Sequence, residues 1–165
     1  MPKLNFETVP LTELRARKLE GDRPRVPTYL NAKDGRTKVL VVDDERVIAD
    51  TLGKILQNSG YEASVSYDAT SALQQCANFH PALVITDVIM PGMNGVEMAM
   101  LIREREPRCK ILLISGQAST TNLLEGARQR GYEFELLAKP IHPTDLLSRL
   151  AALVSDAADD TRARL

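Results

Sequence analysis

Runs of apolar residues alternate with stretches of helical spacing along most of the chain. Continuous apolar runs of strand length occupy residues 39–42, 82–86 and 111–114, and two weaker runs lie at 62–66 and 134–138. Continuous apolar runs of this length, bounded by turn residues, are typical of strands whose two faces are both covered. The pattern therefore predicts five strands.

Between the predicted strands, apolar residues recur every three to four positions, which is typical of amphipathic helices. The five apolar stripes lie within residues 47–56, 69–76, 96–102, 123–127 and 146–153. Strands that alternate with helices predict an α/β fold, in which helices cover both faces of a parallel sheet.

The two ends of the chain differ from this alternating region. Residues 1–36 contain four of the nine prolines and carry a net charge of +3, from eight basic and five acidic residues. We interpret this segment as an arm that is flexible or docks on a partner, with a short helix capped by Thr12. Residues 37–154 form the predicted domain, and residues 155–165 are a polar tail that is expected to fray.

The composition excludes several classes of protein. Of the 165 residues, 44% are hydrophobic and 26% charged, and the net charge of −1 does not favour a nucleic-acid or membrane-surface partner. The two cysteines lack the spacing of a zinc site, and Cys76 is predicted to lie in the core. No apolar run approaches the roughly 18 residues of a membrane span and no signal-peptide pattern precedes the domain, so a cytoplasmic location is expected.

Polar side chains stand where four of the five predicted strands end. Asp43 and Asp44 follow the first strand, Asp87 the third, Ser115 the fourth and Lys139 the fifth. Because the carboxyl ends of parallel strands meet at one edge of a sheet, we expect these side chains to lie close together. This edge is where open α/β sheets bind their ligands.

Three carboxylates at one edge would repel one another by about 4 kcal/mol per pair at a separation of ~4 Å. One lysine does not balance them, whereas Mg²⁺ prefers carboxylate oxygens and water as ligands. A cation, Lys139 and the Ser115 hydroxyl around Asp87 would suit a phosphoryl group, with Asp87 as the nucleophile that accepts it.

Each of these residues also has an ordinary structural explanation. Paired aspartates after a strand often form a turn, and Asp87 would simply begin a loop that leads to a helix capped by Asn94. Ser115 would be an ordinary turn residue, and Lys139 would be an ordinary residue at the end of a strand. It is their combination at the ends of four strands that favours a functional site.

Four segments carry a family resemblance: VLVVDDE (39–45), VITDVIMPGMNG (84–95), ILLISG (111–116) and LLAKP (136–140). In this order they resemble the receiver domain of two-component response regulators, over roughly residues 37–154. The resemblance implies a flavodoxin-like, doubly wound sheet of five parallel strands in the order 2-1-3-4-5, with five helices.

The resemblance also implies the roles of individual residues. Asp87 would be the phosphoacceptor, and Mg²⁺ would be bound by Asp43, Asp44, Asp87 and the backbone carbonyl of Ile89. The phosphoryl donor would be a sensor histidine kinase or a phosphotransfer protein. The chain would then accept a phosphoryl group without being a turnover enzyme.

Ser115 would be the switch hydroxyl and Lys139 the charge partner of the phosphoryl group, with a cis bond between Lys139 and Pro140. Phosphorylation would alter a surface on the fourth helix, the fifth strand and the fifth helix, to which a downstream protein binds. Many family members carry an aromatic residue on the fifth strand at the position of Leu136, so the switch here departs from theirs.

A second departure is the apolar side chain of Ile89, which cannot assist an attacking water, although Gln117 could position one. We therefore expect a long-lived phosphoryl group. No output domain follows residue 153, which predicts a stand-alone receiver that contacts protein partners, with a homodimer as one option, and not nucleic acid directly.

Two other functions stay open. One is a receiver-like interaction module that signals without phosphorylation, which the leucine at position 136 favours. The other is a metal-dependent phosphatase with an aspartate nucleophile. Such enzymes need an acid two residues after the nucleophile, where this chain has Ile89.

Overall fold

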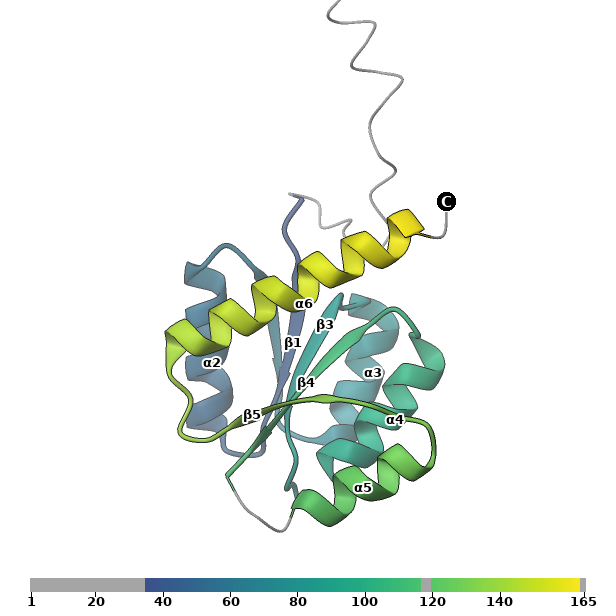
Figure 1. The fold of residues 1–165 in the computed structure, drawn as a ribbon. Coiled ribbons are helices and arrows are strands. Elements are labelled where there is room, and N and C mark those ends of the chain that lie inside the picture. Colours follow the sequence, from purple (N-terminus) through teal and green to yellow (C-terminus); the bar gives the residue numbers. More distant parts are fainter. Residues whose placement is uncertain (1–34, 117–119, 164–165) are drawn as a thin grey trace, which may run out of the picture.

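The computed structural model describes residues 35–116 and 120–163, and it confirms the predicted α/β fold (Figure 1). All five strands are parallel, in the order β2-β1-β3-β4-β5 that the family resemblance implies. Their bounds are β1 Lys38–Val42, β2 Glu62–Ser66, β3 Leu83–Asp87, β4 Lys110–Ser115 and β5 Glu135–Ala138. The first and third strands are therefore neighbours, as the prediction of a shared acidic site requires.

In the part of the chain that the structure describes, five helices cover the sheet, two on one face and three on the other (Figure 1). Their bounds are α2 Arg46–Asn58, α3 Ala69–Phe79, α4 Gly95–Arg105, α5 Thr121–Gln129 and α6 Pro143–Ala163. Helices α2 and α6 pack on one face, and helices α3, α4 and α5 pack on the opposite face.

Alternate residues of each central strand enter the two layers of core. Val39 and Val41 of β1 pack with Leu52 and Leu56 of α2, whereas Leu40 faces the layer of α3 and α4. Each fully buried Val or Leu side chain contributes about 1.5–3 kcal/mol of hydrophobic stabilisation. The continuous apolar runs in the sequence reflect this burial on both faces, and Cys76 lies in the core as predicted.

Local signals in the sequence set the start of α4. The Asn94 side chain accepts from the Glu97 backbone amide at 2.9 Å, and the Glu97 carboxylate accepts from the Asn94 amide at 3.2 Å. This reciprocal capping box satisfies amides that the first turn leaves without helical partners. The helix after Asp87 therefore begins at a fixed point, and this fixes the loop between them.

The C-terminal helix is longer than the sequence pattern indicated. Helix α6 continues through Ala163, whereas the apolar stripe ended at Leu153 and a frayed tail was expected beyond it. The predicted arm, its short helix near Thr12 and Gln117 lie outside the described residues, apart from the last residues before β1.

Candidate functional site

The carboxyl ends of β1 and β3 bring the acidic residues together. Val42 pairs with Thr86 in the parallel register, so Asp43 and Asp87 follow at equivalent heights on neighbouring strands. The Asp43 carboxylate accepts from the Glu45 amide at 2.9 Å, and the Asp87 carboxylate accepts from the Val88 amide at 3.0 Å. These bonds hold both carboxylates at the edge of the sheet.

Asp43, Asp44 and Asp87 each offer a carboxylate oxygen, and these oxygens lie within 4.8 Å of one another. Asp43 is 2% exposed and Asp87 is 9% exposed, whereas Asp44 faces solvent. Two full negative charges at that separation repel by about 3.5 kcal/mol at an effective dielectric constant of 20. The fold therefore maintains an acidic cluster at a considerable electrostatic cost.

Lys139 offsets part of this repulsion. Its Nζ lies 3.6 Å from Asp43 Oδ2 and 3.5 Å from Asp87 Oδ1, with the lysine side chain 24% exposed. The backbone amide of Lys139 donates to the Ser115 carbonyl at 2.8 Å, which ties the end of β5 to the end of β4. The predicted cis bond between Lys139 and Pro140 is confirmed.

Burial raises the pKa of the Asp87 carboxyl above its ordinary value. The positive charge of Lys139 acts in the opposite direction, and the negative charge of Asp43 raises the pKa further. Burial disfavours the charged form of a carboxyl group because water no longer solvates it. The cluster thus contains a carboxylate that a cation would stabilise strongly.

The three carboxylates suit a small divalent cation. Mg²⁺ binds oxygen ligands at about 2.0–2.1 Å, so oxygens that share one ion lie at most about 4.2 Å apart. The oxygens of the cluster lie within 4.8 Å of one another, so small side-chain rotations are enough to bring them into this range. The donor set, all carboxylate and partly open to solvent at Asp44, also matches the preference of Mg²⁺ for retained waters.

Ser115 lies at the same edge, at the end of β4, but its side chain contacts the start of α5. The Ser115 hydroxyl donates to the Thr120 hydroxyl at 3.0 Å, and both residues are buried. Ile89 lies in the loop between β3 and α4, with its side chain 42% exposed. The roles expected for Ser115 and for the Ile89 carbonyl stay predictions.

Sequence reasoning missed two residues of this edge. Thr120 has no motif of its own, because it is identified by its hydrogen bond to Ser115. Gly95 is needed for close packing, since a Cβ at this position would lie 1.9 Å from the Asp87 carbonyl oxygen. Its place at the first position of a helix, at the end of the loop that follows Asp87, was the signal in the sequence.

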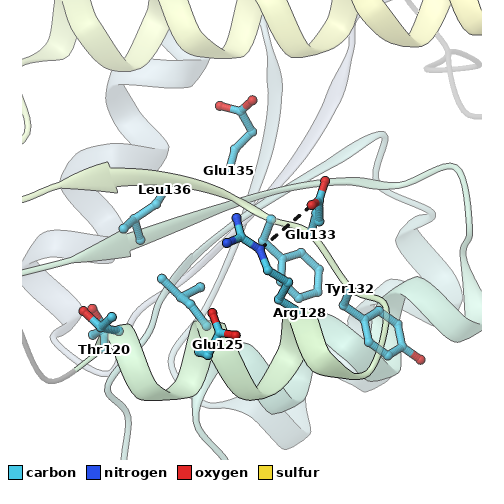
Figure 2. A pocket seen from close by; sticks show the side chains of 10 residues that line it. Thr120, Glu125, Arg128, Tyr132, Glu133, Glu135 and Leu136 are labelled. Atoms are coloured by element: carbon cyan, nitrogen blue, oxygen red, sulfur yellow. Dashed lines mark ion pairs between the residues drawn. The ribbon is translucent and has the colours of Figure 1, made fainter.

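A groove of about 550 Å³ lies beside this edge, between α5 and β5 (Figure 2). It is lined by Thr120, Thr121, Leu124, Glu125, Arg128, Tyr132, Glu133, Phe134, Glu135 and Leu136. Leu136, at the position discussed above, is 40% exposed in this groove. The Tyr132 and Phe134 rings stack on each other before β5, with centroids 6.2 Å apart.

Comparison with protein families assigns the chain to a known family. The family described as the response regulator receiver domain matches residues 39–151, which is more than half of the chain. The chain belongs to this family. Receiver domains are the response modules of two-component systems and interact with histidine kinases.

Solved structures agree with this assignment. A CheY-like response regulator receiver domain from Methanospirillum hungatei JF-1 superposes with a TM-score of 0.70 at 26% identity, over 76% of this chain and 98% of that chain. The chemotaxis protein CheY4 of Vibrio cholerae has a TM-score of 0.65 at 29% identity, over 72% of this receiver and 98% of that chain.

Among curated proteins, the receiver is similar to the DNA-binding response regulator MtrA of Mycolicibacterium paratuberculosis. The two are 29% identical over 117 residues, or 71% of this chain and 51% of MtrA. The response regulator MprA of Mycobacterium sp. (strain KMS) is 30% identical over 74% of this chain and 53% of its own length. The chain thus spans about half the length of these curated relatives.

None of the helices in residues 35–116 and 120–163 is long and apolar enough to cross a membrane.

Proposed function

We propose that this receiver accepts a phosphoryl group on Asp87 from a histidine kinase or phosphotransfer protein, with Mg²⁺ bound at the acidic cluster. One observation carries the proposal: buried Asp87 lies beside Lys139 and within 4.8 Å of the Asp43 and Asp44 carboxylates. A nucleophilic carboxylate next to a cation site and a fixed ammonium group is the arrangement that phosphoryl transfer requires.

In the proposed reaction, a carboxylate oxygen of Asp87 attacks the phosphorus atom of a phosphohistidine. The new O–P bond forms as the P–N bond breaks, and the departing imidazole nitrogen keeps the bonding electron pair and takes a proton from solvent. Lys139 neutralises negative charge on the phosphoryl oxygens. Bound Mg²⁺ would supply further charge neutralisation, and Asp43, Asp44, Asp87 and the Ile89 carbonyl would hold it.

The proposed output is a change in the groove between α5 and β5, which binds a downstream protein. Thr120 and Leu136 both line this groove, and Thr120 contacts Ser115 at the edge of the sheet (Figure 2). A shift of the Ser115 side chain towards a phosphoryl group would therefore reach the groove directly. The proposed partner is a protein, and the DNA-binding activity named for MtrA stays a property of MtrA.

The apolar side chain of Ile89 supports a phosphoryl group with a long lifetime. A polar residue at this exposed position would hold or activate a water beside Asp87, and isoleucine does neither. The same side chain argues against the alternative of a metal-dependent phosphatase. The other alternative, a module that signals without phosphorylation, is favoured by the leucine at position 136 on β5.

Intact-mass spectrometry after incubation with acetyl phosphate tests the proposal. With Mg²⁺, the protein should gain one phosphoryl group, and it should gain none with EDTA or as Asp87→Asn. Asp50→Asn is a matched control, because Asp50 is a carboxylate on α2 that bonds to Tyr67 outside the cluster. Catalytic consumption of acetyl phosphate would instead indicate a phosphatase, and no mass gain would indicate an interaction module.

A further inference from the structure

The strand β5, which lines the α5–β5 groove, is poorly covered by the rest of the receiver. Three of its four residues are exposed, whereas β1, β3 and β4 are almost wholly buried. Leu136 is 40% exposed and belongs to neither layer of the core. Because strands of a parallel sheet are normally covered on both faces, β5 has room for a further segment of chain.

Two aromatic rings just before β5 are held in place in this groove (Figure 2). Tyr132 and Phe134 stack with their ring planes inclined by 10°. The Arg103 guanidinium lies 5.5 Å from the centroid of the Phe134 ring, and the Tyr132 hydroxyl donates to Glu104 Oε1 at 2.8 Å. Rings that are already fixed lose little freedom when a ligand binds, so they form a preorganised apolar surface.

The described residues that line the groove are mainly acidic where they are charged. They include Glu125, Glu133 and Glu135 against one basic residue, Arg128. Glu133 pairs with Arg128 at 3.9 Å, and Glu135 pairs with Arg149 at 3.2 Å. Ion pairs in contact with solvent contribute little, so a further cation can compete for these carboxylates. A fitting occupant therefore combines apolar side chains with positive charge.

The chain has such a segment shortly before β1, in residues that precede the part the structure describes. Residues 23–27 read RPRVP, with two arginines and no acidic residue, and residues 1–36 carry a net charge of +3. Proline-rich segments favour an extended helix with three residues per turn, which would place Pro24 and Pro27 on one face. Segments of this kind bind grooves that are lined by aromatic side chains.

The start of β1 lies near enough to the groove for this segment to reach it. In the register of the sheet, Glu135 is level with Val41 and three strands away. Three strand spacings of about 4.8 Å amount to roughly 15 Å. The 11 residue steps from Pro27 to Lys38 span up to about 36 Å, which leaves enough chain to pass around the intervening loops.

We propose that residues 23–27 dock in the α5–β5 groove of their own chain, with the prolines on Tyr132 and Phe134 and the arginines beside the groove's glutamates. The docked segment covers Leu136. A short tether gives the segment an effective concentration of the order of millimolar, so a weak contact is sufficient. The docking does not depend on phosphorylation. Its consequence, competition with a downstream protein for the groove, rests on the proposed function.

A nitroxide spin label at Asp22→Cys in the full chain tests the docking by NMR. The two natural cysteines react poorly with the label, because they are buried and burial raises their pKa values. The unpaired electron broadens signals of nearby nuclei. The backbone amide signals of Glu125, Phe134 and Leu136 should therefore lose intensity and regain it when the nitroxide is reduced. Signals of α2, on the opposite face of the sheet, should stay sharp.

Two sets of substitutions show whether the broadening comes from the proposed contact. Leu136→Lys removes an apolar contact and repels the arginines, so the loss of intensity should disappear. Val47→Lys is the matched control, because Val47 is an apolar residue on α2 that is 80% exposed, and it should keep the loss. Arg23→Glu combined with Arg25→Glu should also abolish the loss, and it leaves the folded receiver unaltered if Leu136→Lys disturbs β5.

Sharp groove signals in the labelled chain, or broadening that survives the arginine substitutions, overturn the inference. Spin-labelled chains mixed with isotope-labelled chains that carry no nitroxide reveal docking on a second copy. Little broadening is expected in this mixture, and broadening as strong as within one chain overturns docking in the same chain. Phosphorylation of Asp87 is measured separately by mass, so either proposal can fail while the other stands.

Discussion

Ionisable side chains lie at both edges of the sheet, but they are arranged differently. At the amino-terminal edge, Lys38, His80 and Glu106 line a shallow groove of about 430 Å³. His80 Nδ1 lies 3.0 Å from Glu106 Oε1, with the two side chains 62% and 36% exposed. Lys38 Nζ donates to the Phe79 carbonyl at 3.3 Å and lies over the Phe79 ring.

At the carboxyl-terminal edge, like charges converge, and the Asp43 and Asp87 carboxylates are buried. Asp43 and Asp87 share Lys139, and Asp44 adds a third carboxylate within 4.8 Å. Ion pairs in contact with solvent, such as His80 and Glu106, contribute little to stability, and such pairs are common on protein surfaces. A buried excess of negative charge is destabilising by itself, so its presence indicates a ligand that offsets it.

The largest expected contrast comes from removing one lysine at each edge. In EDTA, Lys139→Met should lower the free energy of unfolding by about 2–3 kcal/mol, because Asp43 and Asp87 lose their shared counter-charge. Lys38→Met should cost only about 1 kcal/mol, since it removes one partly buried hydrogen bond to a carbonyl and a cation–π contact. Urea unfolding measures both, and equal costs at the two edges would contradict the comparison.

Mg²⁺ should stabilise the protein through the carboxyl-terminal edge alone. A ligand that binds the folded state adds about 2.7 kcal/mol at a free concentration one hundred times its Kd. Asp44→Asn should lose most of this gain and change stability little in EDTA, because Asp44 is exposed. Glu106→Gln is the control at the other edge, and a loss of Mg²⁺ stabilisation in that variant would show that the ion binds elsewhere.

Substitutions of two glycines in helices near the site distinguish the effect of close packing from the effect of helix propensity. Gly95→Ala should destabilise the protein by roughly 1–3 kcal/mol, because the new Cβ would clash with the Asp87 backbone. Gly126→Ala in α5 should stabilise it by about 0.5–1 kcal/mol, since no atom lies within 4 Å of the new Cβ. If thermal melts show that both substitutions change the stability in the same direction, the packing of Gly95 against Asp87 is not tight.

The smallest expected effect concerns the buried thiols near the amino-terminal edge, which should make the stability of the protein depend on pH. Burial raises the pKa of Cys76 to about 11, from an ordinary value of 9.0, and it raises the pKa of Cys109 as well. The unfolded chain therefore loses the Cys76 proton first, as pH rises. The stabilisation is fully present below pH 9.0 and is lost as pH rises through about 11.

In this window the free energy of unfolding should fall by about 1.4 kcal/mol per pH unit for each such thiol. Cys76→Ala should make the decline shallower by that amount, whatever its effect at neutral pH. Urea unfolding at a series of alkaline pH values provides the measurement. Identical slopes with and without the Cys76 thiol would show that it is not buried in the folded protein.

The fold and most of the site were predictable from the sequence. Continuous apolar strands such as 39–42 predict burial on both faces, and polar residues at four strand ends predict a common edge. Asp43, Asp87 and Lys139 meet there because β1 and β3 are neighbours and β5 closes on β4. Periodicity alone did not give the strand order, which came from the resemblance to receivers.

Other features depend on contacts that no pattern encodes. The hydrogen bond between Ser115 and Thr120 has no signal in the sequence, because hydroxyl residues near a turn are common. The continuation of α6 to Ala163 was missed because its last turns lack an apolar stripe.

Chemical mapping of the phosphorylated residue tests the central claim most directly. Borohydride reduces an aspartyl phosphate to homoserine, and peptide sequencing by mass spectrometry then locates the converted residue. After phosphorylation in Mg²⁺, homoserine should appear at position 87 and nowhere else. Homoserine at position 43 or 44, or a phosphoryl group that resists reduction because it sits on a serine, would contradict the assignment of Asp87 as the acceptor.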